Sequence, residues 1–353
     1  MVRNKLKGVL KKVKREDEAV VLQKAVENAP RITNETVAEH REQVLKKARK
    51  HIIPLAHSKK QVVALTSGMF VLAVVSFFTY TTLALYKFQQ SSTFLYHVTQ
   101  VIPFPVAKSG KNYVTYENYL FELRHYTHYY ETQQKLNFND EQGKQQLNSF
   151  KQQARQKVVD DALVRQLAKQ NGVSVSQKEV NDQITLVRNQ NRLGNNDKVF
   201  EDVLREYWGW SVDDFKRSLQ QEMLAQKLVA KLDTDTKTRA NAALAELQSG
   251  ADFETTAKKY SDDKATKDNG GEFGISIDRT NRDLTAQTVS TLFSLQAGQI
   301  SGVIDTGYSL EIVKTIELQG DHVRGAHIVF TFKDINTYLD PLKDKQKTTI
   351  YIH

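Results

Sequence analysis

A run of twenty-five residues without a charged side chain, Val62 to Tyr86, constrains this chain more than any other feature. As a helix rising 1.5 Å per residue it would be roughly 37 Å long, enough to cross a hydrocarbon core of about 30 Å. A buried core helix is the alternative, although such helices rarely run this long without polar residues. The length of the run, its late start and the lack of a small-residue cleavage site argue against a cleavable signal peptide. We therefore predict a transmembrane helix over residues 62–86.

The charge of the chain is divided unevenly by this run. Of 50 Lys and Arg residues and 41 Asp and Glu residues, 16 basic and 7 acidic ones lie in residues 1–61, so the remainder is balanced at 34 of each. Lys59 and Lys60 precede the run, and only Lys87 lies close behind it. The positive-inside rule then places residues 1–61 in the cytoplasm and residues 88–353 outside it.

The basic tail of residues 1–61 has three possible partners. A basic amphipathic helix beside a membrane usually lies on anionic lipid, which favours a membrane-surface role. Nucleic acid is an alternative, but no aromatic residues alternate with the charges, so we expect no nucleic-acid partner. A protein partner is the third possibility.

Several kinds of chemistry are excluded by composition. The chain has no cysteine, which excludes a disulfide scaffold, a zinc-thiolate site and a thiol nucleophile and also fits an exported domain. His125 and His128 share a helix face, but no third ligand lies near them in sequence, so we interpret them as surface residues. We expect no metal and no cofactor.

The predicted architecture is α+β in five segments. After the tail (1–61) and the membrane helix (62–86), Pro103 and Pro105 indicate a non-helical stalk over 87–105. A helical domain over 106–235 begins with two short strands. A domain of mixed strands and helices occupies 236–353.

Helix-capping residues punctuate the helical domain. Thr115 precedes one helix, and Ser176 with Glu179 and Ser211 with Asp214 form capping boxes for two others. Together with the segments AKQNGVSVSQKEV (168–180) and YWGWSVDDFKRSL (207–219), this order resembles the N-terminal domain of SurA/PrsA-type extracytoplasmic chaperones. The resemblance implies a helical cradle that binds unfolded chains.

The last domain contains five spaced motifs in a fixed order. They are Gly-x-x-Phe ending at Phe253, Tyr-Ser-x-Asp at 260–263, Gly-Gly-x-Phe-Gly at 270–274, Phe-x-Leu-x-x-Gly-x-Ile-Ser at 293–301, and Gly-Tyr at 307–308. This run resembles parvulin-type (PpiC, rotamase) peptidyl-prolyl isomerases. The resemblance implies an antiparallel sheet with surrounding helices and rotation of X-Pro bonds, which requires no nucleophile, metal or redox cofactor.

The resemblance also implies site residues. Asp263 matches the acidic residue that faces the twisting carbonyl. The substrate-binding positions are Phe273, Leu284, Thr288 and Phe293, of which Thr288 stands where the family has an aromatic residue. In the alternative reading, Phe273 and Leu284 are core residues and Asp263 caps a loop.

Both histidines of the family pattern are displaced in this chain. The closing strand lacks its histidine, for which Ser309 or Glu311 is a possible replacement. The strand Arg-x-x-His-Ile, expected before the first helix, instead follows the closing strand at residues 324–328. We interpret this as a circular permutation that would place His327 beside Asp263. The alternative is a truncated second repeat with His327 an ordinary strand residue.

These features lead to one functional hypothesis with two alternatives. We expect a membrane-anchored extracytoplasmic foldase, a peptidyl-prolyl isomerase and chaperone whose partners are unfolded or proline-containing exported polypeptides. The alternatives are a catalytically inactive holdase that uses the same surfaces, and an envelope scaffold that recruits a cytoplasmic partner through the basic tail.

Overall fold

The computed structural model describes residues 18–24, 26–28, 32–52, 59–110, 112–189 and 196–352. The chain forms two compact units, Met1–Tyr80 and Thr81–His353, which we treat separately. Much of the predicted basic tail, including residues 1–17, lies outside the described residues.

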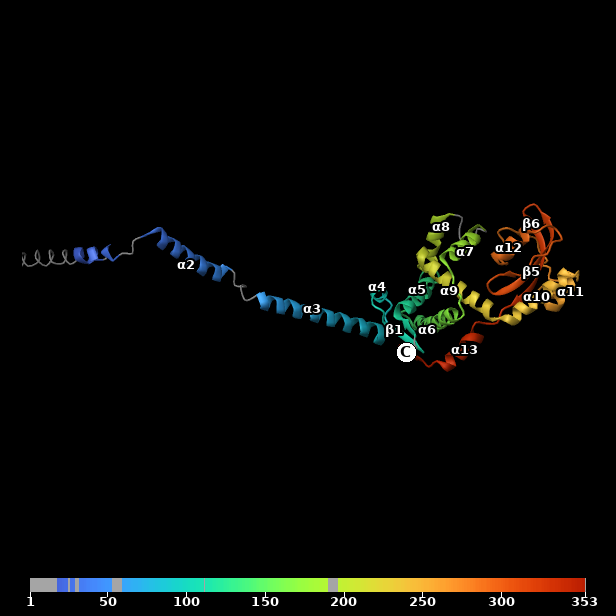
Figure 1. Cartoon of the computed structure of the whole chain (residues 1–353), viewed down its shortest axis with the longest axis horizontal. Helices are drawn as coiled ribbons and strands as arrows, with labels where there is room; N and C mark the ends of the chain where they lie inside the picture. Colours follow the sequence, from blue (N-terminus) through green and yellow to red (C-terminus); the bar gives the residue numbers. More distant parts are fainter. Residues whose placement is uncertain are drawn as a thin grey trace, which may run out of the picture. The chain divides into compact units, whose positions relative to one another are not determined.

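The first unit contains α2 (Asn34–Ile52) and nearly all of α3 (Lys59–Thr82) (Figure 1). The apolar helical segment Gln61–Lys87 is the one candidate membrane span in the described part of the chain, by length and composition. Most of the large apolar side chains from Val62 to Tyr80 are exposed, Phe77 being half-buried.

The end of the predicted membrane segment belongs to the second unit. After Thr82 the helix continues as a π-helical turn, η1 (Leu83–Lys87), in which Ala84 and Leu85 are buried. The Tyr116 hydroxyl donates a hydrogen bond of 2.5 Å to the carbonyl of Leu85. Residues 62–80 of the predicted span expose most of their apolar side chains, whereas after them Leu83 is exposed and Ala84 and Leu85 are buried. As a helix, residues 62–80 measure about 28 Å, still close to the thickness of a hydrocarbon core.

The predicted stalk over residues 87–105 is wrong. Its middle forms α4 (Thr93–Val101), which is capped by Ser92 and buries Leu95 in the helical core. Pro103 and Pro105 exclude helix only at and just before their own positions, and upstream of them the burial of Leu95 stabilises a helix.

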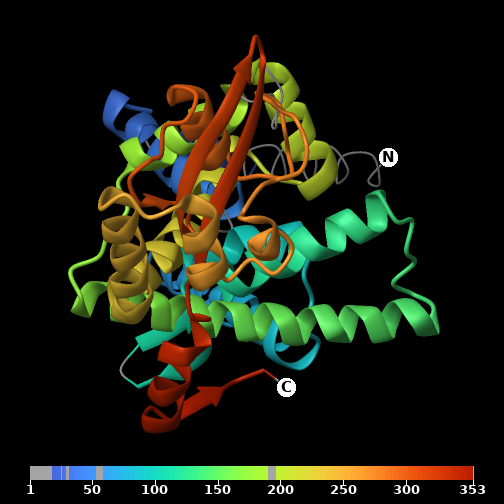
Figure 2. The same ribbon diagram turned by 90° about the vertical axis from the view of Figure 1, so that its right-hand side faces the viewer.

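A helical module is formed by residues 81–232 and 333–352. Its first part has a strand pair, β1 (Pro105–Ser109) and β2 (Asn112–Thr115), followed by α5 (Tyr116–Thr132) and the long α6 (Glu141–Gln170). The shorter elements α7 (Gln177–Asn189), α8 (Asp197–Val203) and η2 (Leu204–Trp208) lead to α9 (Val212–Leu232). Figure 2 shows α6 as the long green helix that runs beside α5.

The predicted helix starts in this module are confirmed. Thr115 caps α5 by accepting from the Asn118 amide, and Ser211 with Asp214 forms a complete capping box for α9. Ser176 and Glu179 bond reciprocally at the start of α7. These local signals hold because each satisfies backbone N–H groups that a helix leaves free.

A sheet module is formed by residues 234–331. α10 (Thr234–Gln248), α11 (Phe253–Tyr260) and α12 (Ala286–Ser294) accompany a four-stranded antiparallel sheet of order β3-β6-β5-β4. The short η3 (Lys267–Asn269) packs against α11. The strands are β3 (Ile277–Asp278), β4 (Ile304–Asp305), β5 (Ser309–Gln319) and β6 (His322–Thr331).

The pairing of β5 with β6 agrees with the predicted antiparallel hairpin, whose long arms Figure 2 shows side by side. Gly320 lies in the turn between them with a φ of +57°, a left-handed conformation that favours glycine. Val313 is paired with His327 in the register of the two strands.

The last residues of the chain return to the helical module. α13 (Asn336–Lys345) places Leu339 in the core of that module, and β7 (Thr348–Ile350) pairs antiparallel with β1. The predicted domain of residues 236–353 thus includes a C-terminal segment that packs with the residues predicted as the helical domain.

Candidate active site

His327 lies in the middle of β6, and a glycine turn fixes the backbone at that point. The His327 amide donates a hydrogen bond of 2.9 Å to the carbonyl of Gly271. Gly271 has a φ of +80°, and a Cβ there would lie 2.2 Å from the carbonyl oxygen of His327. The Gly-Gly motif is therefore required for the turn to approach the strand so closely.

Asp263 reaches the same place from the loop that follows α11. Ser261 ends this helix, and its hydroxyl accepts hydrogen bonds from the amides of Val329 (3.2 Å) and Asp263 (3.3 Å). The side chain of Ser261 thus joins the loop to β6. Ser261 therefore acts as a helix-ending residue that fixes the backbone of the loop.

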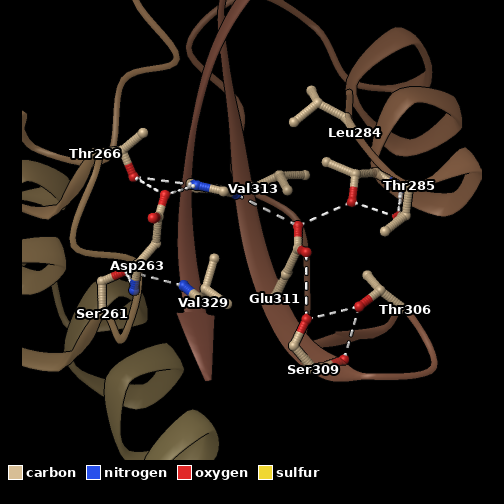
Figure 3. A network of polar contacts seen from close by, with 12 residues as sticks. Ser261, Asp263, Thr266, Leu284, Thr285, Thr306, Ser309, Glu311, Val313 and Val329 are labelled. Atoms are coloured by element: carbon tan, nitrogen blue, oxygen red, sulfur yellow. Dashed lines mark hydrogen bonds and ion pairs between the residues drawn. The ribbon is translucent and has the colours of Figure 1, made fainter. Parts of the chain in front are cut away.

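The structure brings Asp263 and His327 together. His327 Nε2 lies 2.9 Å from Asp263 Oδ2 and 3.1 Å from the Thr266 hydroxyl, which itself donates to Asp263 Oδ2 at 2.5 Å (Figure 3). Burial tends to raise the pKa of Asp263, but the hydrogen bonds from Thr266 and His327 outweigh it and hold that pKa below its usual value. Asp263 is therefore a carboxylate at neutral pH.

Glu311 approaches the other edge of the histidine ring from β5. Its Oε2 lies 3.6 Å from His327 Nδ1 and accepts a 2.9 Å hydrogen bond from the Thr288 hydroxyl. Its Oε1 is 3.4 Å from the Ser309 hydroxyl. Through His327 these contacts join Asp263 to Glu311 in one polar network, and Figure 3 labels both carboxylates.

Apolar side chains flank this polar network. The ring centroids of Phe273 and His327 lie 4.5 Å apart. Phe273, Leu284 and Phe293 are half-buried members of one hydrophobic cluster. Its buried members are Ile277, Val289, Leu292, Val313 and Val323.

Thr288 differs from the other predicted substrate-binding residues. It is almost fully buried, and its hydroxyl bonds to the Glu311 carboxylate and the Thr285 hydroxyl. The structure therefore places Thr288 behind Glu311, away from an accessible surface. The substrate-binding roles of Phe273, Leu284 and Phe293 stay predictions.

Three polar residues of the network were not anticipated from the sequence. Thr266 follows Asp263 by three residues, a spacing at which a hydroxyl often bonds a loop carboxylate. Thr285 caps α12, and a Ser or Thr before a helix is a recognisable signal. Thr306, which lies 2.8 Å from the Ser309 hydroxyl, carries no such signal.

Comparison with known proteins agrees with this geometry. The family model for the PPIC-type PPIase domain matches residues 223–317, and the model for the SurA-like N-terminal domain matches residues 56–229. Together the two matches extend over residues 56–317. The PPIase match ends within β5, so β6 and His327 lie outside it. This is the result expected if the family's first strand has moved behind its last, and the permutation stays our interpretation.

Curated relatives cover the chain only in part. It is 29% identical over 195 residues to the foldase protein PrsA of Caldanaerobacter subterraneus subsp. tengcongensis, covering 50% of this chain and 60% of the relative. It is 36% identical over 109 residues to the chaperone SurA of Albidiferax ferrireducens, covering 28% of this chain and 23% of the relative. It is 26% identical over 169 residues to a parvulin-like PPIase of Rickettsia typhi, covering 45% of this chain and 56% of the relative. The chain thus spans less than two thirds of the length of each of these relatives.

A solved structure also matches. The foldase protein PrsA from Streptococcus pneumoniae is 22% identical, and the match covers 55% of this chain and 76% of that one. The TM-score of 0.19 is too low for the match to support a shared arrangement.

Proposed function

We propose that this chain is a membrane-anchored foldase whose sheet module isomerises X-Pro bonds in exported polypeptides. The observation that carries the proposal is the contact between Asp263 and His327 beside the ring of Phe273. Two relatives named as foldases or PPIases and one named as a chaperone support both activities.

The arrangement suits rotation about an amide bond. Planarity is stabilised by resonance, which places negative charge on the carbonyl oxygen and opposes rotation with a barrier of about 18–20 kcal/mol. An anionic Asp263 next to that oxygen would disfavour the planar form more than the twisted one. The half-buried side chains of Phe273 and Leu284 would hold the apolar proline ring. No covalent bond is made or broken.

A protease-free X-Pro peptide assay on the full chain in detergent tests the isomerase. We expect acceleration over buffer that falls at least about tenfold in Asp263→Ala and in His327→Ala, because each tenfold loss requires only about 1.4 kcal/mol of transition-state stabilisation. His322→Ala, an exposed change on the same strand, is the matched control. Equal rates in all four proteins would refute the site assignment.

One observation favours a weaker catalyst or an inactive holdase. The position of the family's pocket aromatic is occupied by buried Thr288, and a buried carboxylate lies next to it. If the wild-type chain suppresses the aggregation of an unfolded client but gives no isomerisation above buffer, the holdase is the correct function.

The proposed anchor is residues 62–80, with the basic tail in the cytoplasm and the second unit outside. Support comes from the uncharged, exposed apolar helix and from Lys59 and Lys60 before it. Protease added to intact cells should degrade the second unit and leave the tail protected. Degradation of the tail with the second unit protected would indicate the opposite orientation.

A further inference from the structure

Glu311 is a carboxylate buried in the sheet module. It is 6% exposed, and a buried carboxylate is costly unless other groups hold it through hydrogen bonds or a counter-charge. Two hydroxyl branches support it here. The first is Thr288, which in turn contacts Thr285 at 2.8 Å. The second is Ser309, which contacts Thr306 at 2.8 Å.

The third neighbour of Glu311 is the histidine ring. His327 Nδ1 is buried and has no hydrogen-bond partner in the part of the chain that the structure describes, and the Glu311 carboxylate lies 3.6 Å from it. The opposite ring nitrogen faces Asp263 at 2.9 Å. Both edges of one imidazole thus face a carboxylate.

This arrangement limits what the ring can do. A neutral imidazole has one N–H and can donate to one carboxylate, whereas the imidazolium has two and can donate to both. The other groups around the ring carry no charge. They are the Thr266 hydroxyl and the ring of Phe273. The two carboxylates are therefore the charged groups that face it among the described residues.

Three departures from the parvulin pattern meet at this point. An aromatic residue is replaced by Thr288, and a histidine by Ser309, while Glu311 follows two residues later. Considered singly, each change appears only to remove a residue type that the parvulin site contains. In the structure the two hydroxyls bond to the carboxylate, and the carboxylate covers the edge of His327 that would otherwise face no polar group.

We propose that Glu311 is the positioning residue of the isomerase site. Supported by Thr288, it holds His327 from the Nδ1 side and so keeps Nε2 directed at Asp263. Glu311, and not Ser309, thus takes the place of the missing histidine. This inference rests on the proposed isomerase for its kinetic consequence, but its structural part can be tested without any activity.

The structural test is ¹⁵N NMR of the full chain in detergent micelles with selectively labelled histidine. The signal lost in His327→Gln identifies His327, and exposed His322 on the same strand is the internal reference. We expect Glu311→Gln to change the ¹⁵N chemical shift of His327 Nδ1, because a neutral amide replaces the carboxylate 3.6 Å from that nitrogen. Thr288→Val should change it in the same direction. Ser309→Ala should change it less than Thr288→Val does, because the Ser309 hydroxyl lies 3.4 Å from Glu311 and the Thr288 hydroxyl 2.9 Å, and the His322 signal should stay near the wild type.

The kinetic test compares the same variants in X-Pro isomerisation across a range of pH. Glu311→Gln should lower kcat by between about tenfold and a hundredfold, as misplacement of a catalytic group does, with KM within about twofold. It should also change the shape of the pH profile, which a loss of packing alone would not do.

The outcomes separate the two proposals. An unchanged His327 signal in a folded Glu311→Gln protein overturns the positioning role whatever the kinetics. If the wild-type chain gives no X-Pro isomerisation above buffer, the proposed function is wrong. The NMR result would still decide whether Glu311 positions His327. If Ser309→Ala shifts His327 and Glu311→Gln does not, Ser309 is the replacement and the inference is wrong.

Discussion

Glu122 in α5 offers the sharpest test of the energetics of the helical module. It is 8% exposed, has no hydrogen-bond partner among the described residues, and lines a cavity of about 520 Å³ between α5, α6 and α9. Burial raises its pKa from 4.5 to about 7, although Lys157 opposes the shift. The folded state therefore resists ionisation of this carboxyl.

The contribution of Glu122 to the free energy of unfolding, and its sign, follow from this pKa. Because the folded-state pKa is the higher one, Glu122 stabilises the fold below about pH 4.5, and this stability is lost as the pH rises through about 7. The displacement corresponds to a total of roughly 3 kcal/mol, most of it between about pH 5 and pH 8. Glu122→Gln removes the ionisation and keeps the shape. Its free energy of unfolding relative to wild type should therefore rise by about that amount over this range.

The assay is urea unfolding of the detergent-solubilised chain, followed by tryptophan fluorescence. Both tryptophans of the chain, Trp208 and Trp210, lie in the helical module, and Trp210 stacks on Phe121 beside Glu122. Glu131→Gln, at an exposed position of the same helix, is the matched control and should follow the wild-type curve. A difference between Glu122→Gln and wild type that stays flat with pH would refute the reasoning.

Three further predictions follow from particular contacts. Gly271→Ala places a Cβ 2.2 Å from the His327 carbonyl at a positive φ, so urea unfolding should show a loss of at least about 1–3 kcal/mol. Leu339→Ala empties a fully buried position and should cost about 2–5 kcal/mol in the same experiment, and a change under about 1 kcal/mol would contradict the packing of α13. Thr266→Val removes a hydrogen bond to Asp263, so the pKa of that carboxyl, measured by ¹³C NMR, should rise toward its usual value. An unchanged or lower pKa would mean that Thr266 does not hold the charge.

What could be predicted from the sequence depended on how far each signal reaches along the chain. The start of α9 needed only Ser211 and Asp214, three residues apart, and the β5–β6 hairpin needed only a short turn at Gly320. The relation of His327 to Asp263 required a family pattern, because 64 residues separate them. Without that pattern the two residues carry no common signal.

Other features had weak sequence signals or none. Ser92 is a helix-capping residue before α4, but Pro103 and Pro105 close behind the helix suggest an extended segment, and the burial of Leu95 decides the structure. The role of Thr288 could not be predicted either, because a hydroxyl in place of an aromatic ring looks like a simple loss until its partner Glu311 is located in space.

The pairing of β7 with β1 has a consequence for how the chain is made. The Thr348 hydroxyl bonds to the Ser109 hydroxyl across 239 residues of sequence, and Arg155 donates to the carbonyl of Ile352. Contacts at such separation form late, because the chain between them must be ordered first. During synthesis the sheet module can fold as soon as β6 has emerged, whereas the helical module waits for the last few residues. In a protein that we propose assists the folding of others, β1 therefore stays without its second partner strand until Thr348–Ile350 have been made.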